Sequence, residues 1–120
     1  MARILVHVTV GPSDPTKAAL AFFVARAVIE EGHQLVLFIA GDGVSLLTAD
    51  SAASVQGIGT GRLSEHFDAI NAGTAEVYFS GMSAKARNIA TEDVALRGAS
   101  PGMPDKLVQL IDECDKVISY

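Results

Sequence analysis

The 120-residue chain contains a single cysteine, Cys114, and no tryptophan. An intramolecular disulfide needs two cysteines, so the fold must depend on its apolar core, and the composition suits a reducing compartment. The chain also lacks a run of about 20 apolar residues, the length that spans a bilayer, because its longest apolar segment covers only 18–29. The apolar run at 4–6 is too short for a signal peptide. We therefore expect a cytoplasmic protein with no membrane segment.

Positive charge is scarce, with nine lysines and arginines against fourteen acidic residues and a net charge of −5. Aromatic residues make up only 6% of the chain, and no run of lysines or arginines occurs. Nucleic-acid binding depends mainly on basic side chains that neutralise phosphates. The composition therefore argues against a nucleic-acid partner.

Common motifs for metals, nucleotides and hydrolase nucleophiles are also absent. His7, His33 and His66 are scattered without the spacing of metal ligands. No Walker A motif, G-x-S-x-G elbow or H-E-x-x-H motif occurs. The glycine-rich segment 57–61 lacks the G-x-G-x-x-G spacing and follows no clear strand, so it is predicted to be a flexible loop. We expect no metal and no cofactor.

Apolar residues, by contrast, are abundant and account for 49% of the chain. The length suits one domain spanning 1–120. A domain of this size has too little interior to bury so much apolar surface. The composition therefore predicts a homo-oligomer.

Apolar segments typical of buried strands alternate with segments of helical periodicity. A strand, a long helix and a second strand in succession form a crossover unit, which indicates an α/β fold with a mostly parallel sheet. The first helix should begin at Pro15, with Asp14 as its N-cap, and end before a left-handed Gly32. The pattern predicts strands at 4–10, 35–40, 76–79 and 117–118 and helices at 15–31, 44–47, 63–73, 83–89 and 104–113.

Two segments are harder to interpret. Residues 48–61 are small and weakly patterned, and 98–104 are predicted to be a loop. The helix that follows this loop should turn Leu107, Leu110 and Ile111 inward.

The carboxyl edge of a parallel sheet is where ligands usually bind, and three loops should meet there: 11–17, 41–45 and 80–87. In the third loop, Ser80, Gly81 and Ser83 precede a helix that carries Lys85 and Arg87 in about its first turn. Cations are unfavourable at a helix N-terminus, so this placement suggests an anion site. The alternative is an ordinary surface helix with solvated basic side chains.

The other two loops carry three more candidate ligand-binding residues. Asp14 suits a helix cap better than a catalytic acid, and Lys17 follows it in the same loop. Asp42 lies between two glycines, where it could orient a ligand hydroxyl or only shape the turn. Cys114 precedes the last strand and so belongs at the opposite edge, where burial suits it better than nucleophilic work. No catalytic residue is assigned.

Several short segments resemble the DsrE/DsrF-like proteins in their order and spacing. The likeness covers nearly the whole chain apart from 51–61. It is carried by Gly11, Asp14-Pro15-Thr16, the alanine-rich helix, Glu31-Gly32-His33, Val36 to Phe38, Gly41-Asp42-Gly43-Val44, Gly81-Met82-Ser83-Ala84-Lys85-Ala86-Arg87, Gly98-Ala99 and Cys114-Asp115-Lys116-Val117-Ile118.

The resemblance implies a three-layer α/β/α sandwich with a sheet of about four to five strands. It also implies a cytoplasmic protein that forms homo- or hetero-oligomers, often trimers or hexamers, and works with a sulfur-relay partner. Active members carry a persulfide on a cysteine in the loop after the third main strand. The matching position here is Ser80, and a hydroxyl cannot carry a persulfide.

Three functions are then compatible with the chain. The favoured one is a noncatalytic family member that binds a small anion or a partner protein at the loop 80–87. The second is an enzyme that still takes part in sulfur relay as a sulfurtransferase. The third is a structural subunit that completes an oligomer with a cysteine-bearing paralogue.

Overall fold

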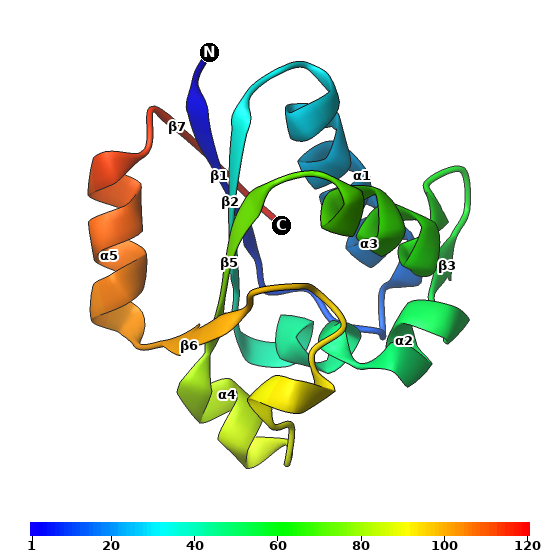
Figure 1. Cartoon of the computed structure of the whole chain (residues 1–120). Helices are drawn as coiled ribbons and strands as arrows, with labels where there is room; N and C mark the ends of the chain where they lie inside the picture. Colours follow the sequence, from blue (N-terminus) through cyan, green and yellow to red (C-terminus); the bar gives the residue numbers. More distant parts are fainter.

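A computed structural model describes the whole chain, residues 1–120. Its centre is a sheet of five strands in the order β6-β5-β2-β1-β7, and every neighbouring pair is parallel (Figure 1). The strands are β1 (Arg3–Val8), β2 (Gln34–Ile39), β5 (Ala75–Ser80), β6 (Ser100–Gly102) and β7 (Lys116–Ser119). The predicted α/β fold with a mostly parallel sheet is confirmed.

Helices cover the sheet on both faces, which makes three layers. On one face lie α1 (Pro15–Glu30) and α3 (Leu63–Ala72), and on the other lies α5 (Pro104–Glu113) (Figure 1). The larger core lies under α1 and α3, where Phe22 and Phe67 pack edge to face. Leu110 of α5 closes a smaller core on Leu5 and Val36. Because both faces are covered, the central strands are apolar almost throughout.

The ends of α1 follow the sequence closely. The Asp14 carboxylate accepts a hydrogen bond from the Lys17 backbone N–H at 3.2 Å, and Pro15 occupies the first turn. At the other end Gly32 has a φ of +82°, and the His33 N–H donates to the Val28 carbonyl at 3.0 Å. This is the Schellman arrangement, in which a left-handed glycine closes the helix.

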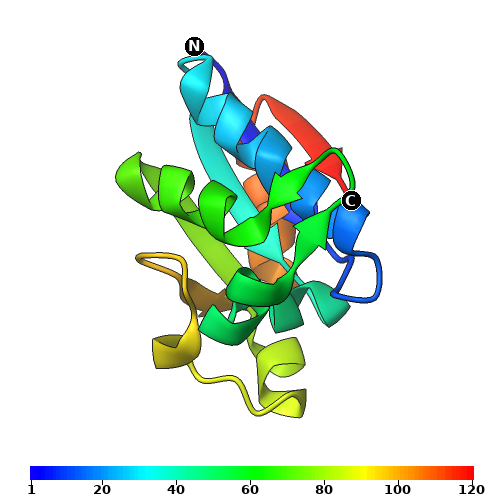
Figure 2. The same ribbon diagram turned by 90° about the vertical axis from the view of Figure 1, so that its right-hand side faces the viewer.

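Segment 57–61, predicted as a flexible loop, is instead part of a hairpin, and regular structure also covers most of the weakly patterned segment 48–61. It contains α2 (Ala49–Ser54) and an antiparallel hairpin of β3 (Gln56–Gly57) and β4 (Gly61–Arg62). The hairpin lies against the start of α1 (Figure 2), where the Ile58 N–H donates to the Thr16 hydroxyl at 3.1 Å. The Thr60 hydroxyl donates to the Thr16 carbonyl at 3.0 Å. These tertiary bonds, rather than local propensity, order the segment.

The segment predicted as a loop before α5 holds the short edge strand β6. It contains a proline, which a sheet tolerates at its edge. In α5, Leu110 is buried as expected, but Ile111 is 45% exposed and does not face inward. No helix of the protein has the length and apolar character needed to cross a membrane.

Candidate functional site

Three loops meet at the carboxyl edge of the sheet because β5, β2 and β1 are neighbours in it. The loop after β2 forms a 3₁₀ helix, η1 (Gly41–Leu47), and the loop after β5 forms α4 (Gly81–Ala86), both beyond the ends of the strands (Figure 1). A methyl group added at Gly11 would lie 2.7 Å from the Asp42 Cβ, and one at Gly43 would lie 2.7 Å from the Val8 carbonyl oxygen. Glycine is therefore needed at both positions for the first two loops to touch.

Two serine hydroxyls join the loop after β5 to the loop after β2. The Ser80 hydroxyl caps α4 by accepting from the Ser83 N–H at 3.2 Å. The Ser83 hydroxyl accepts from the Gly41 N–H at 3.0 Å. Neither hydroxyl donates a hydrogen bond within the protein, and both residues are half-buried. Both O–H groups therefore remain free to donate to a ligand.

An ion pair joins the same two loops closer to solvent. Arg87 Nη2 lies 2.7 Å from Asp42 Oδ1, and Arg87 Nη1 donates to the Ser83 carbonyl at 3.1 Å. The Asp42 side chain is 75% exposed, so it is accessible from solvent. The Asp42 carboxylate thus binds the Arg87 guanidinium and links the two loops, an interaction that the sequence did not predict.

The placement of the basic residues at the start of a helix is wrong. The helix starts directly after Ser80 and ends at Ala86, so Lys85 lies in its last turn and Arg87 is its C-cap. It stops there because Asn88 adopts a left-handed φ of +55° and the Ile89 N–H donates to the Ala84 carbonyl, as in a Schellman motif. Cations are favourable at this end, so their position needs no ligand to explain it.

The remaining predicted residues are placed as follows. Lys85 on α4 and Lys17 at the start of α1 are both exposed, and neither pairs with a carboxylate. Asp14 serves as the cap of α1, and no hydrogen bond joins it to the loop 80–87. A Cβ at Gly81 would meet Pro101 at an ordinary 3.6 Å, so no close contact requires glycine there.

Sequence reasoning missed Gly11 and Gly43 as site-building residues. Both glycines follow predicted strands, but glycine is required at these positions only because the two loops pack closely together. The distance between those loops is a tertiary property that one sequence does not contain.

The only thiol lies at the other edge of the sheet, as the sequence predicts. Cys114 follows α5, and the neighbouring Asp115 N–H donates to the carbonyl of Arg3 at the start of β1. Burial raises the pKa of the Cys114 thiol, and the nearby Arg3 guanidinium only partly offsets this effect. A thiol that resists ionisation is a poor nucleophile and a poor persulfide carrier.

The histidines remain apart in the structure. His7 packs edge to face on Phe38, and burial lowers its pKa. The His66 ring stacks on Phe23, and its Nε2 lies 2.7 Å from the Thr60 carbonyl oxygen. No group of three or more histidine, cysteine or acidic side chains is arranged to hold a metal ion.

Comparison with known proteins gives a consistent picture. The model of the DsrE/DsrF-like family matches residues 2–120. The fold is similar to the crystal structure of the YchN protein from E. coli, with a TM-score of 0.78 and 21% identity over the whole of both chains. It is also similar to MTH1491 of Methanobacterium thermoautotrophicum, a protein of unknown function, with a TM-score of 0.68 and 18% identity, again over both whole chains. No curated protein sequence matches the chain.

Proposed function

Because the chain belongs to the DsrE/DsrF-like family, we propose that it binds a small anionic ligand at the loop from Ser80 to Arg87 and carries no persulfide itself. The family is associated with sulfur relay, a chemistry that needs a thiolate sulfur as acceptor. A serine hydroxyl at position 80 cannot accept sulfane sulfur. In this chain the same surface would bind a ligand but would transfer no sulfur.

The hydrogen bond from the Gly41 N–H to the Ser83 hydroxyl is the observation that supports this proposal most directly. It holds the Ser83 hydroxyl between two loops, and the Ser83 N–H holds the Ser80 hydroxyl beside it, so both free O–H donors are in place to meet a ligand. Lys85 adds an unpaired ammonium group to the same short helix. The Arg87 guanidinium adds charge-assisted donors. Asp42 already binds this group, so the anion must compete with the Asp42 carboxylate for it.

Cys114 is a weak candidate for sulfur transfer in this proposal. It lies at the amino edge of the sheet, whereas Ser80 ends a strand at the carboxyl edge. Its thiol is half-buried and has a raised pKa. Treatment with a persulfide donor followed by mass spectrometry tests this point, and a peptide of Cys114 that gained one sulfur atom would favour sulfur relay instead.

A cysteine-bearing relay protein is a second candidate for the same edge. The observation that favours it is Met82, which lies on α4 within the loop 80–87 and is 66% exposed. Exposed methionines are common on surfaces that bind other proteins. Co-purification from the cytoplasm, where we place the protein, would test this partner, and Met82→Glu should abolish the association if α4 is the contact.

We also propose that a second copy of the chain covers the α5 side. One helix of ten residues covers this face of a five-stranded sheet. Apolar side chains on this helix and next to it remain open to solvent: Met103, Val108, Ile111 and Val117. A trimer or hexamer would bury them. Analytical ultracentrifugation should show an oligomer that Val108→Glu dissociates, and a monomeric wild-type protein would contradict this assignment.

The anion site can be tested by titration of the ¹⁵N-labelled protein with inorganic phosphate. We expect amide shifts within residues 80–87 and 41–45. Lys85→Gln and Arg87→Gln should each weaken binding about fivefold, because each removes one charge-assisted contact. Arg62→Gln, which removes an exposed cation on β4, is the matched control. Shifts that are absent, or equally reduced by the control variant, would overturn the proposal.

A further inference from the structure

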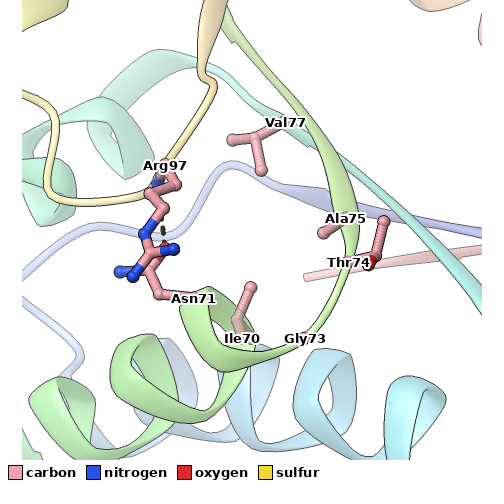
Figure 3. A pocket seen from close by; sticks show the side chains of 7 residues that line it. All are labelled: Ile70, Asn71, Gly73, Thr74, Ala75, Val77 and Arg97. Carbon is pink, nitrogen blue, oxygen red and sulfur yellow. Dashed lines mark hydrogen bonds between the residues drawn. The ribbon is translucent and has the colours of Figure 1, made fainter.

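A cavity of about 170 Å³ lies at the other end of β5, between the first residues of this strand and the end of α3 (Figure 3). It is separate from the loop 80–87, because Ala75 begins β5 and Ser80 ends it. Its walls are formed by Ile70, Asn71, Gly73, Thr74, Ala75, Val77 and Arg97.

The cavity exists because the edge strand stops short. β6 pairs with β5 only at Tyr78–Ser80, whereas β5 begins at Ala75. Just before β6 the chain turns away at Gly98, whose φ of +69° lies in the left-handed region that favours glycine. The outer edge of β5 from Ala75 to Val77 therefore has no neighbouring strand, and a wedge opens beside it.

Asn71 at the end of α3 holds the diverging chain in place. Its side-chain oxygen accepts from the Arg97 backbone N–H at 2.8 Å, and its side-chain N–H donates to the Ala95 carbonyl at 3.0 Å. This double contact fixes the backbone that carries the Arg97 side chain. The two hydrogen bonds of the Asn71 amide group thus hold the wedge open.

The lining combines one cation with an apolar wall. Figure 3 shows the Arg97 guanidinium across the cavity from β5, whose residues Ala75 and Val77 line the opposite side. The side chain of Ile70 continues this apolar wall. Arg97 forms no ion pair with any acidic side chain. An unpaired guanidinium facing apolar side chains suits a ligand that has one charged end and one apolar end.

We propose that this cavity binds a small monocarboxylate, with the carboxylate on Arg97 and the apolar part against Ile70, Ala75 and Val77. A pocket of about 170 Å³ has room for a ligand about as large as butyrate. The site is independent of the anion site at 80–87.

The helix end beside the cavity selects against a doubly charged anion. Ile70 and Asn71 in the last turn of α3 line the cavity, and the C-terminal end of a helix carries partial negative charge. A phosphate dianion would be repelled more strongly than a carboxylate, and it offers no apolar part for the wall. The preferred ligand therefore differs in class from the anion proposed for the carboxyl edge.

Titration with butyrate and with butyramide, its neutral analogue, tests the proposal on the intact chain. We expect butyrate to shift the amides of residues 70–77 and 95–98 and to bind about fivefold to tenfold more tightly than butyramide. Arg97→Gln should remove this preference, because it removes the guanidinium that binds the carboxylate. It should leave the backbone in place, because the N–H of residue 97 can still donate to Asn71. Arg62→Gln should leave it unchanged.

A second variant and a second ligand complete the test. Ala75→Leu should fill the cavity and weaken butyrate binding while Arg97 remains. Inorganic phosphate should shift residues 80–87 and leave 70–77 unaffected. Equal binding of butyrate and butyramide, an unaltered preference in Arg97→Gln, or butyrate shifts confined to 80–87 would each overturn the assignment, and none of these results bears on phosphate binding at the carboxyl edge.

Discussion

Asp42 and Arg87 are 45 residues apart in the sequence, yet Oδ1 of one lies 2.7 Å from Nη2 of the other. Their contact joins the loop after β2 to the end of α4. Because both side chains are partly exposed, the pair contributes only about 0–1 kcal/mol to stability. In the proposed anion site this carboxylate would compete with the ligand for the Arg87 guanidinium.

Asp42→Asn should therefore tighten anion binding. Loss of the carboxylate charge frees Arg87 and removes repulsion, so we expect phosphate affinity to rise about threefold at low ionic strength. Calorimetric titration measures the change. Asp50→Asn on α2 removes an equal charge away from the site and is the control. Unchanged or weaker binding in Asp42→Asn alone would show that Arg87 does not contact the anion.

Gly11→Ala should destabilise the protein, because the added methyl group would lie 2.7 Å from the Asp42 side chain and 2.8 Å from its carbonyl oxygen. We expect a loss of about 1–3 kcal/mol in the free energy of unfolding, measured with urea. Gly81→Ala is the matched comparison, because its nearest contact is 3.6 Å and its φ is not positive. It should be neutral or stabilising by up to about 1 kcal/mol. Equal losses in both variants would contradict the close packing of the loops.

Stability should fall below about pH 6.5 because of His7. Burial lowers the pKa of His7 in the folded state below its ordinary value of 6.5, so the unfolded chain binds the proton more readily. The contribution of neutral His7 is complete above 6.5 and is lost as the pH falls toward the folded-state pKa. Urea unfolding at pH 7.5 and pH 5.5 measures this slope. His7→Gln should reduce it, and an unchanged slope in this variant would contradict the assignment to His7.

Cys114 should react slowly with thiol reagents. Its raised pKa leaves little thiolate at neutral pH, and the residue is half-buried. We expect alkylation by iodoacetamide at pH 7.5 to be at least about tenfold slower than that of free cysteine. The same measurement in urea is the control and should restore the ordinary rate. Fast alkylation of the folded protein would show that the Cys114 thiol is neither shielded nor raised in pKa.

The parts of the fold that depend on local chemistry were predictable from the sequence. Asp14, Pro15 and Gly32 set the limits of α1 through caps whose geometry each residue type favours. The apolar runs identified four of the five strands in the sheet. Residues 48–61 and β6 were missed because tertiary contacts decide their structure: Thr16 binds the hairpin, and Tyr78 to Ser80 pair with β6.

The candidate site was predictable in location but not in detail. The carboxyl ends of parallel strands share one edge, so the loops 41–45 and 80–87 were expected there, but the strand order that makes them neighbours was not. The pairing of Asp42 with Arg87 and the early end of α4 at Asn88 were not, because a left-handed asparagine has no strong signal in one sequence. Where a helix ends decides whether its basic residues oppose or favour the helix dipole.

The pairing of β7 with β1 also affects how the chain is made. Asp115, just before β7, binds the backbone of Arg3 across a separation of 112 residues. During synthesis, β1 leaves the ribosome long before its outer neighbour exists, so that edge of the sheet stays unpaired while β2 and β5 are added on the other side. An unpaired apolar edge is a common starting point for aggregation, and chaperones that bind nascent chains protect such edges. Expression yield should therefore depend on how soon β7 can pair with β1, as well as on the stability of the finished fold.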